Sequence, residues 1–465
     1  MRRPLRAAVY ATLSLSLAWP GAGTAYTSRG ARSAPVAPMG PALLAGAHAV
    51  DVAPPRGVPL AGYGGSARRL LIPDFLNRYP YAFWFKPSTG IHDPIMARAL
   101  ILHSGDHRLL WVAVDLIGVE PEMVSELKGR LAAMGLRYEA VILSASHTHS
   151  GPGAFSRSRL FSFIALDSLV PDIRERILNA IVGAARQAES QKVPARIGIG
   201  RGEVTGATRS RVGLPLDPDV GVLKVVSVDG RPIALLWNYA IHGTVLRKST
   251  LALSGDVMGA ATRQLEQALG IPVLYTNGAV GDVSPALHGW AGLRQIAEGL
   301  SREVLTTWRR IPVEPSSRLW AVSERISLPP PRLSVKNCLG RWVPTWLTVG
   351  IGWAFPTQAE LVAVAVGTSA WVTIPGELQT RLGQAVKAEG RRHFRHAFVV
   401  GVSNDYAGYF LTPEEYRRPR YIACASLYGE AGGRVVAERA TAMFRRLGDL
   451  EGRRDTALRA RQWGG

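Results

Sequence analysis

The sequence contains little cysteine and lacks long apolar runs. Cys338 and Cys424 are its only cysteines among 465 residues, which excludes a disulfide scaffold and leaves open whether the two pair. The apolar stretch at residues 7–19 is about half of a bilayer span. A second stretch at 340–356 is too short and too broken by proline and glycine to cross a membrane. Neither stretch predicts a membrane-spanning helix.

Signals for nucleic-acid binding and for a serine hydrolase are also missing. The formal charge is +20, but the basic residues are scattered, and no zinc-finger, homeodomain or RNP-like pattern occurs. We therefore expect no nucleic-acid partner, and an anionic membrane surface or lipid head group matches the charge better. Ser284 lies in NGAVGDVSP, a glycine-containing turn that lacks the G-x-S-x-G pattern of a nucleophile elbow.

The N-terminus has the pattern of a secretory signal. Three arginines in the first six positions precede the apolar residues 7–19, and small residues lead up to Ala25. We expect a signal peptide at 1–25 and then a flexible leader at 26–44, rich in glycine, proline, alanine and serine. The expected location is secreted or periplasmic, with membrane association as an open addition.

The body of the chain alternates predicted strands and helices. This pattern over residues 45–448 predicts an α/β fold with layered mixed β-sheets flanked by helices, in a single large catalytic domain. A β-hairpin is expected around the polar turn at 104–107, and an amphipathic helix at 171–191. The last helix is expected at 432–447, followed by a basic tail at 449–465.

Two histidines follow one predicted strand in VILSASHTHSGPGAF. The β-branched apolar run ends at Ser144, and His147, His149 and a Gly-Pro-Gly turn come next. Residues two apart in an extended strand face the same side, so both imidazoles would reach one pocket. A strand end of this kind suits a metal or catalytic site, and the alternative is a polar loop with solvated histidines.

Other candidate residues also follow predicted strands. They are His242 in NYAIHG, Glu377 in IPGE, and Tyr409 and Tyr421 on either side of TPEEY. Each alone has an ordinary structural explanation: a core histidine, an acid in a first helical turn, or packed tyrosines with a wet hydroxyl. Their shared position favours one rim of a sheet.

The segment GRWVPTWLTVGIGWAFP at 340–356 combines tryptophans and aliphatic residues with one charge. It is either a buried or proline-bent loop, or an aromatic surface that touches a membrane or binds an acyl chain.

Six motifs occur in the order found in the neutral/alkaline non-lysosomal ceramidases. The chain resembles this family from about residue 45 to 447, through SASHTHSGPG, NYAIHGT, LSGDVMG, NGAVGDVSP, IPGE and NDYAGYFLTPEEYRRPRY…ASLYG. The family consists of secreted or surface zinc amidases that cleave ceramide into sphingosine and a fatty acid. The resemblance implies a lipid substrate, peripheral contact with a membrane surface and one zinc ion per chain.

The resemblance implies that the zinc ligands are His147, His242, Glu377 and Tyr409. Two imidazoles, a carboxylate and a phenolic oxygen suit zinc and leave room for water or substrate. Zinc in such a site polarises an amide carbonyl and makes water more acidic.

The resemblance also implies four catalytic residues. His149 would move a proton to the leaving amine, while Tyr421 and Arg209 would donate to the developing oxyanion. Ser284 would hold the substrate hydroxyl, stabilise the tetrahedral state or form an acyl-serine, and the sequence leaves these roles open.

The chain departs from the family pattern at several places. It ends soon after its last predicted helix, so we expect the family's C-terminal immunoglobulin-like domain to be missing. Ala286 follows GDVSP where asparagine is common, and Pro419-Arg420-Tyr421-Ile422 replaces a Gln-x-Tyr-Glu pattern. These changes surround the substrate entrance, so acyl-chain and head-group preference stay open.

Two other readings remain. An esterase or phosphoesterase would use the same metal, and Asp256 and Asp282 would supply the extra acidic ligands that phosphate chemistry usually needs. The non-enzymatic alternative is a lipid-binding surface protein with an idle metal site. We expect a zinc-dependent amidohydrolase that acts on ceramide or a related N-acyl lipid.

Overall fold

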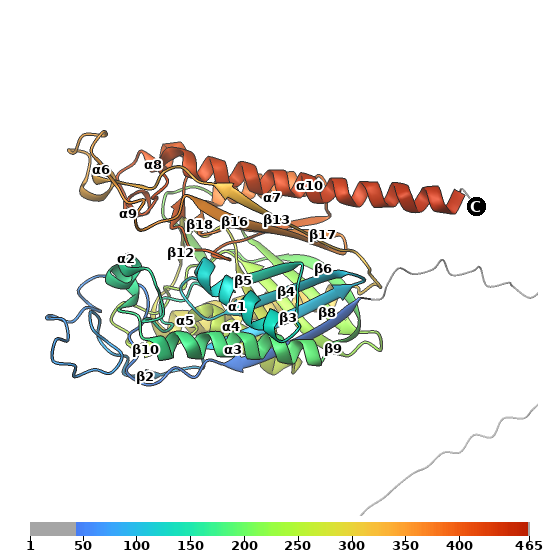
Figure 1. The fold of residues 1–465 in the computed structure, drawn as a ribbon, viewed down its shortest axis with the longest axis horizontal. Coiled ribbons are helices and arrows are strands. Elements are labelled where there is room, and N and C mark those ends of the chain that lie inside the picture. The colour runs from blue at the N-terminus through green and yellow to red at the C-terminus, as the bar shows by residue number, and fades with distance from the viewer. Residues whose placement is uncertain (1–42, 464–465) are drawn as a thin grey trace, which may run out of the picture. The chain divides into compact units, whose positions relative to one another are not determined.

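Two β-sheets stack face to face at the centre of the molecule, and helices cover both outer faces (Figure 1). The computed structural model describes residues 43–463, with side chains up to residue 450. The four layers confirm the expected layered α/β fold. The predicted signal peptide at 1–25, and the leader at 26–44 except its last two residues, lie outside the described residues.

The larger sheet has eight mixed strands. In spatial order they are β11 (Val273–Asn277), β9 (Pro232–Tyr239), β8 (Asp219–Ser227), β6 (Val193–Glu203), β1 (Leu44–Asp51), β3 (Met96–Ser104), β4 (His107–Val114) and β5 (Ala140–Ala145). β3 and β4 form the predicted hairpin, with Ser104 opposite His107. The pairs β4–β5 and β9–β11 are parallel, so within each pair the two carboxyl ends lie at the same edge.

The smaller sheet has four strands and lies over the first. They are β13 (Leu319–Ser327), β16 (Gln358–Val366), β17 (Ser369–Thr373) and β19 (His396–Val400), of which β17 and β19 are parallel. Short two-stranded pairs complete the strands: β2 (Gly90–Ile91) with β10 (Ala252–Leu253), β7 (Thr208–Ser210) with β12 (Val283–Pro285), β14 (Arg332–Ser334) with β15 (Thr348–Gly350), and β18 (Glu377–Leu378) with β20 (Tyr409–Phe410).

The space between the two sheets is filled by apolar side chains from both. Trp111 of β4 meets Trp371 of β17 edge to face, with ring centroids 6.0 Å apart. Phe398 of β19 stacks on Trp371 at 5.3 Å. Large buried aromatic surfaces of this kind are a major source of stability, so the two sheets form one cooperative unit.

Helices cover the outer faces because each carries one apolar stripe. The larger sheet is covered by α1 (Pro121–Ala133), α3 (Pro171–Ser190), α4 (Asp256–Leu269) and α5 (Gly289–Arg310), and the smaller one by α7 (Thr380–Gly390) and α10 (Gly429–Trp463). In α3, Ile173, Ile177 and Ile181 recur every four residues and are buried. Gly46 of β1 allows this close packing, since a Cβ there would lie 2.1 Å from the Ala188 carbonyl oxygen.

The last helix is longer than the sequence indicated. We expected it to end at residue 447, but α10 continues to Trp463. Residues 448–463 contain no proline and many good helix formers, and dense charge does not end a helix. The shorter helices are α2 (Arg159–Phe161), which continues into a π-helical turn at Ser162–Leu166, α6 (Val335–Leu339), α8 (Pro413–Tyr416) and α9 (Tyr421–Cys424).

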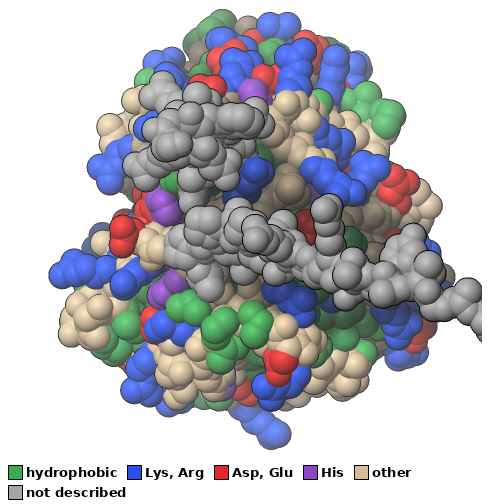
Figure 2. Space-filling view, turned by 90° about the vertical axis from the view of Figure 1, so that its right-hand side faces the viewer, with side chains coloured by type: hydrophobic (Ala, Val, Ile, Leu, Met, Phe, Trp, Pro, Cys, Tyr) green, Lys and Arg blue, Asp and Glu red, His purple; other side chains and the backbone are tan. Residues whose placement is uncertain are grey.

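The segment at 340–356 is mostly exposed, which rules out the buried-loop alternative. Within residues 43–463, no helix combines the length and the apolar character that a bilayer span requires. Figure 2 shows the end of the molecule opposite α6, where lysine and arginine side chains are interspersed with acidic and neutral ones.

Candidate metal centre

The four predicted metal ligands lie just beyond the carboxyl ends of strands. His147 follows β5 and His242 follows β9, in the larger sheet, while Glu377 follows β17 and Tyr409 follows β19, in the smaller one. Two short parallel pairings bring their backbones together: Thr148 bridges Gly243, and Glu377 lies opposite Tyr409 in β18–β20. The sequence favoured one rim of a single sheet for these residues. In the structure they lie together where the edges of two sheets meet.

The sequence pattern suggested that alternation along a strand brings His147 to the site. The structure shows a different cause. The strand β5 ends at Ala145, and His147 has a φ of 66°, a left-handed conformation that few non-glycine residues adopt. Its backbone N–H donates to the Leu116 carbonyl. Its Nδ1 lies 2.6 Å from the Ile117 carbonyl oxygen. Because a carbonyl can only accept, Nδ1 carries the proton and Nε2 keeps the lone pair that binds metals.

Three of the four predicted ligands, His147, His242 and Glu377, bring side-chain nitrogen and oxygen atoms to spacings similar to those around one metal ion. His147 Nε2 lies 3.2 Å from His242 Nε2 and 3.3 Å from Glu377 Oε1, and His242 Nδ1 lies 3.6 Å from Glu377 Oε2. Nitrogen and oxygen ligands around a tetrahedral zinc ion are about 3.3 Å apart. Together with His149, the two histidines form a three-histidine group whose ligand atoms lie within 4.8 Å of one another.

Several buried atoms in this group have no hydrogen-bond partner. They are both ring nitrogens of His149, Nδ1 of His242 and Oε2 of Glu377. Buried polar atoms in proteins are nearly always paired. Converging lone pairs without donors are what a cation would satisfy, so the residues present fit a metal ion.

The electrostatics keep two of the histidines neutral. Burial lowers the pKa of His149 well below its ordinary value, and His147, Arg68 and Arg211 lower it further. Burial also lowers the pKa of His242 well below its ordinary value, assisted by Arg211 and the neighbouring histidines. Neutral imidazole is the form that binds a metal or accepts a proton.

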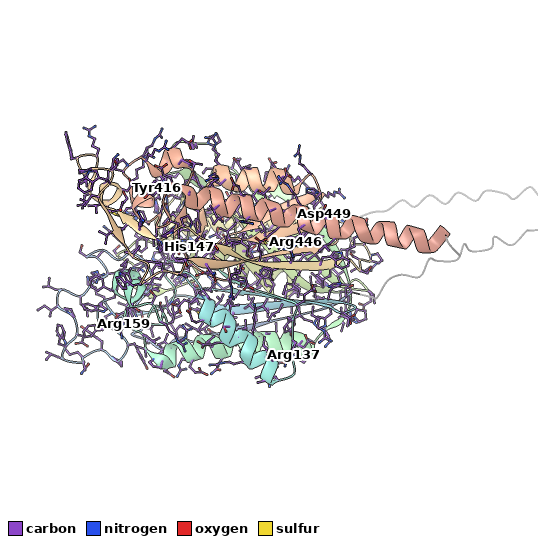
Figure 3. All side chains as sticks on the ribbon, turned by 45° about the horizontal axis from the view of Figure 1, so that its top comes forward. Arg137, His147, Arg159, Tyr416, Arg446 and Asp449 are labelled. Carbon is purple, nitrogen blue, oxygen red and sulfur yellow. A yellow bond between two sulfur atoms is a disulfide. The ribbon has the colours of Figure 1, made fainter. Side chains whose placement is uncertain are left out.

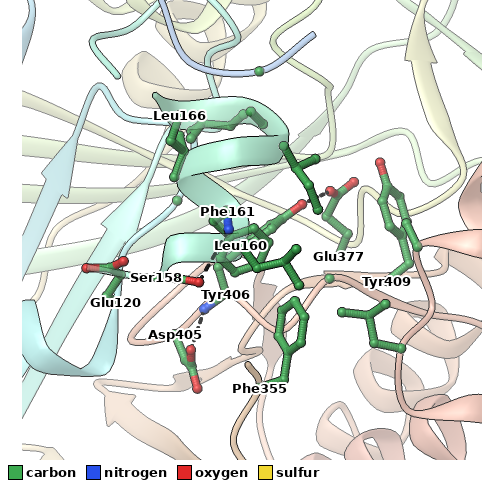
Figure 4. A pocket seen from close by; sticks show the side chains of 18 of the residues that line it. Glu120, Ser158, Leu160, Phe161, Leu166, Phe355, Glu377, Asp405, Tyr406 and Tyr409 are labelled. Carbon is green, nitrogen blue, oxygen red and sulfur yellow. Dashed lines mark hydrogen bonds between the residues drawn. The ribbon is translucent and has the colours of Figure 1, made fainter. Parts of the chain in front are cut away.

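Tyr406 holds Glu377 and was missed from the sequence. Its hydroxyl donates to Glu377 Oε1 at 2.7 Å, and burial and Glu377 raise the pKa of Tyr406 well above its ordinary value. The hydroxyl therefore stays protonated and fixes the carboxylate from outside the ligand set. Tyr406, Glu377 and Tyr409 line the same pocket, and Figure 4 shows the Tyr406 side chain extending toward Glu377. The only sequence signal was its position in NDYAGY, three residues before Tyr409.

The structure does not bring Arg209 into the site, and Arg211 occupies the place expected for it. Arg209 is exposed, and its Nε donates to the Pro285 carbonyl at 3.3 Å. Arg211 donates through Nε to Ser284 Oγ at 2.9 Å and through Nη1 to Tyr409 Oη at 3.2 Å. Although burial opposes its charge, Tyr409 and Glu377 raise the pKa of Arg211, which keeps the guanidinium cationic.

Ser284 and Tyr421 lie at different depths. Ser284 is in β12, paired with β7, and reaches the site only through its contact with Arg211. Tyr421 is 73% exposed at the start of α9, and its ring centroid is 6.1 Å from that of Tyr409. Tyr421 thus lies at the cavity mouth, and Ser284 behind the guanidinium.

Neither Asp256 nor Asp282 belongs to the three-histidine group. Asp256 accepts hydrogen bonds from the backbone N–H groups of Leu246 and Val257. Asp282 accepts from the backbone N–H and the hydroxyl of Thr380. Both acids support the local backbone, so the acidic second-metal set of a phosphoesterase is not found in the described part of the chain.

A large cavity of about 2160 Å³ leads to this group. His149, His242, Glu377 and Tyr409 line its polar end, and apolar side chains line much of the rest, including Phe155, Leu160, Phe161, Leu166 and Phe355 (Figure 4). His147 lies in the interior of the molecule, with 1% of its surface exposed (Figure 3). A charged end and a long apolar wall suit an amphiphilic ligand.

The loop before β2 closes over His149. A Cβ at Gly62 would lie 2.4 Å from His149 Nδ1, so only glycine fits beside the ring. Arg68 is 1% exposed and donates to the carbonyls of Ala61 and His149.

Cys338 and Cys424 form a disulfide, which settles the pairing left open by the sequence. The bond joins α6 to α9. It thereby fastens the exposed segment at 340–356 to the helix that begins with Tyr421.

Comparisons with known proteins agree with this architecture. A family model described as neutral/alkaline non-lysosomal ceramidase, N-terminal, matches residues 76–299, which include both histidine motifs. The chain is 25% identical over 449 residues to a neutral ceramidase from Pseudomonas aeruginosa, covering 75% of this chain and 66% of that protein. It is 22% identical over 485 residues to neutral ceramidase B from Dictyostelium discoideum, covering 76% and 67%.

A solved structure of neutral ceramidase from Pseudomonas aeruginosa shares the fold. The TM-score is 0.75 at 20% identity, over 88% of this chain and 75% of that chain. The chain spans about two thirds of the length of the curated relatives just named.

Proposed function

Because the chain belongs to the neutral/alkaline non-lysosomal ceramidase family, we propose that it is a zinc-dependent amidohydrolase. Its proposed reaction is hydrolysis of the amide of ceramide, or of a related N-acyl lipid, to a sphingoid base and a fatty acid. The observation that carries this proposal is the convergence of His147, His242 and Glu377 at the polar end of a large apolar cavity.

His147, His242 and Glu377 would hold the zinc ion, with Tyr409 completing the set. His242 Nδ1 and Glu377 Oε2 are buried without a hydrogen-bond donor, and a three-histidine set that includes His149 is the competing arrangement. Zinc in this position supplies Lewis acidity, which polarises an amide carbonyl and makes water more acidic. Tyr406 keeps the Glu377 carboxylate in one orientation.

The remaining residues would position the substrate and move protons. Water adds to the amide carbonyl carbon, the C–N bond breaks, and the departing nitrogen must gain a proton. His149 is neutral and has two unpaired ring nitrogens, so it would accept the proton from water and pass it to the amine. The Arg211 guanidinium would stabilise the negative charge that develops on the carbonyl oxygen, and Tyr421 would donate from the cavity mouth. Ser284, held by Arg211, would orient this cation.

We also propose export to the periplasm or the outside of the cell. The secretory pattern at residues 1–25 and the disulfide between Cys338 and Cys424 support it, since stable disulfides are typical of oxidising compartments. Detecting the chain with its N-terminus near residue 26 in a periplasmic or culture fraction tests this, and an uncleaved cytoplasmic chain contradicts it.

Two histidine variants test the metal site and the reaction together. We expect purified wild-type protein to contain about one zinc ion per chain and to hydrolyse fluorescent ceramide. His147→Ala should lose both zinc and activity, whereas His149→Ala should keep zinc and lose turnover. Metal analysis by mass spectrometry and a ceramide assay provide the two readouts.

Two outcomes would change these assignments. Equal loss of zinc in both variants would favour the three-histidine set and remove the proton-transfer role from His149. Zinc at one per chain with turnover of a phosphoester and none of an amide would reject the amidohydrolase.

A further inference from the structure

Two separate segments expose large apolar side chains to solvent. The first, which we call the Leu71 lobe, comprises residues 69–78, and the second, the Trp342 lobe, comprises residues 339–353. Their strongly exposed side chains include Leu71 (99%), Leu76 (78%), Trp342 (87%) and Trp346 (77%). Monomeric soluble proteins rarely expose such clusters unless they serve as contact surfaces.

Both lobes extend from the same end of the molecule. Figure 1 shows the segment before β2 and the segment around α6 extending beyond the sheets on one side, below and above α2. Residues of both also line the cavity: Arg69 from the Leu71 lobe, and Ile351 and Trp353 from the Trp342 lobe. The lobes therefore flank the opening of the cavity that holds the metal centre.

Hydrogen bonds at the base of the Leu71 lobe fix its backbone, so its apolar side chains are held in their exposed positions. The Asp74 N–H donates to the Phe83 carbonyl at 2.9 Å, and the Asp74 carboxylate accepts from the Tyr79 N–H at 2.7 Å. A series of edge-to-face aromatic contacts at 4.7–5.4 Å connects the lobe to the π-helical turn, through Phe75, Phe83, Trp84 and Phe163.

The Trp342 lobe is fastened at both sides. The β14–β15 pair closes its base, and the disulfide of Cys338 binds it to α9. Asn337 donates from Nδ2 to the Tyr416 carbonyl at 2.8 Å. These contacts hold the loop that carries the exposed tryptophans.

The Trp342 lobe and its base carry charge of one sign, whereas the Leu71 lobe has Arg69 and Arg78 beside a single acid, Asp74. Residues 332–356 contain the basic Arg332, Lys336 and Arg341 and no acidic residue. The Arg341 guanidinium lies 5.2 Å from the centroid of the Trp342 ring. Tryptophan with adjacent arginine is the combination that lies at the boundary of acyl chains and anionic head groups.

We propose that the two lobes form a docking surface for a lipid bilayer that contains anionic lipid. Leu71, Leu76, Trp342 and Trp346 enter the interfacial region, and the neighbouring arginines bind the head groups. The docked surface places the cavity mouth against the bilayer, so a membrane lipid reaches the metal centre without crossing water. That last step rests on the proposed function, whereas the docking itself does not.

Sedimentation with ceramide-free vesicles tests the docking. We expect wild-type protein to bind phosphatidylcholine vesicles that contain phosphatidylglycerol more tightly than vesicles of phosphatidylcholine alone. Trp342→Ser/Trp346→Ser and Leu71→Ser/Leu76→Ser should each weaken binding by at least about tenfold. Met134→Ser/Val228→Ser is the matched control, because these exposed apolar residues follow α1 and β8 at the opposite end of the larger sheet.

A second readout separates docking from catalysis. Turnover of a short-chain ceramide dissolved in detergent should stay within about twofold of wild type in both lobe variants, while turnover of ceramide in vesicles falls with binding. Suppose that the lobe variants lose vesicle binding and that neither they nor the wild-type protein hydrolyses the amide. That result would support docking and reject the proposed function. Vesicle binding that is absent, or unchanged in both lobe variants, overturns the docking proposal. Lobe-dependent dimers in light scattering without vesicle binding overturn it in favour of a second copy of this chain.

Discussion

Arg211 connects the polar groups at the inner end of the cavity. It donates to Ser284 and Tyr409, while the exposed Arg209, two residues earlier, contacts only the Pro285 carbonyl among the partners described above. Replacing Arg211 by methionine removes a cation next to the expected oxyanion. We expect kcat on detergent-dissolved ceramide to fall about 100-fold in Arg211→Met.

Arg209→Met is the matched control for this prediction. It removes the same charge from the same strand end, but we expect kcat within about twofold of wild type, because surface substitutions have small effects. The two variants are compared by steady-state kinetics at equal zinc content. The reverse order of effects would show that Arg209, which the family resemblance indicated, performs the role.

At the scale of residues, the sequence predicted the side chains that converge better than the side chains that support them. His147, His242 and Glu377 stand in motifs whose residue types are distinctive, and the structure brings them together. The sequence did not predict Arg211 and Tyr406 as site residues, because their roles depend on the direction of side chains in irregular backbone. The motif alone did not distinguish Arg209, which lies in β7, from Arg211, which follows the strand in irregular backbone.

The disulfide between α6 and α9 is the main covalent constraint on the elements around the cavity mouth. It closes a loop of 86 residues. By the chain-entropy model, a loop of this length stabilises the folded state by about 4–5 kcal/mol. We expect Cys338→Ser/Cys424→Ser to lower the free energy of unfolding by up to this amount, measured by urea unfolding.

Measuring zinc in Cys338→Ser/Cys424→Ser shows whether loss of the disulfide lowers stability alone or also disturbs the proposed metal site. The bond is distant in sequence from His147 and His242, so the double variant should keep its zinc below the unfolding transition. A variant as stable as wild type would mean that the α6–α9 contact holds without the bond. Reduction of wild-type protein should reproduce the double variant.

At the scale of elements, regular strands and amphipathic helices were predictable, whereas short or tertiary-defined ones were not. The β3–β4 hairpin and α3 follow from local apolar periodicity. The strand β13 carries Glu324 and Arg325 in its middle, and only its pairing with β16 makes it a strand. The two-residue strands β18 and β20 are defined by each other.

The stability of the whole molecule should depend on pH through two buried acids. Burial raises the pKa of Asp256 to about 7 and that of Asp405 to about 7, from 3.8. Between pH 3.8 and about 7, both carboxyl groups are protonated in the folded chain and ionised in the unfolded chain. The free energy of unfolding contributed by each acid is therefore fully present below pH 3.8 and is lost as the pH rises to about 7.

Urea unfolding at several pH values between about 4 and 7 measures this slope. In Asp256→Asn the slope against pH should be less negative by about 1.4 kcal/mol per pH unit, because one proton no longer participates. Identical slopes would mean that Asp256 is ionised in the folded protein. The stability of the variant at one pH does not decide the matter, since asparagine cannot accept both hydrogen bonds that Asp256 receives.

At the scale of the molecule, the sequence predicted layers of sheets and helices but not how the sheets meet. The contact of Trp111 with Trp371 joins parts of the chain that are distant in sequence, and no local pattern records it. The cavity has the same origin, because its walls come from β13 and β16 of the smaller sheet, from α1 and α2, and from loops along most of the chain.

The placement of the ligands on two sheets has a consequence for the order of synthesis. His147 and His242 follow strands of the larger sheet, and Glu377 and Tyr409 follow strands of the smaller one, so a growing chain carries both imidazoles long before it carries the carboxylate and the phenol. The region 76–299, although it contains the histidines, cannot assemble the full ligand set by itself. We therefore expect metal loading to be a late event, completed only after Tyr409 has been synthesised and the two sheets have packed together.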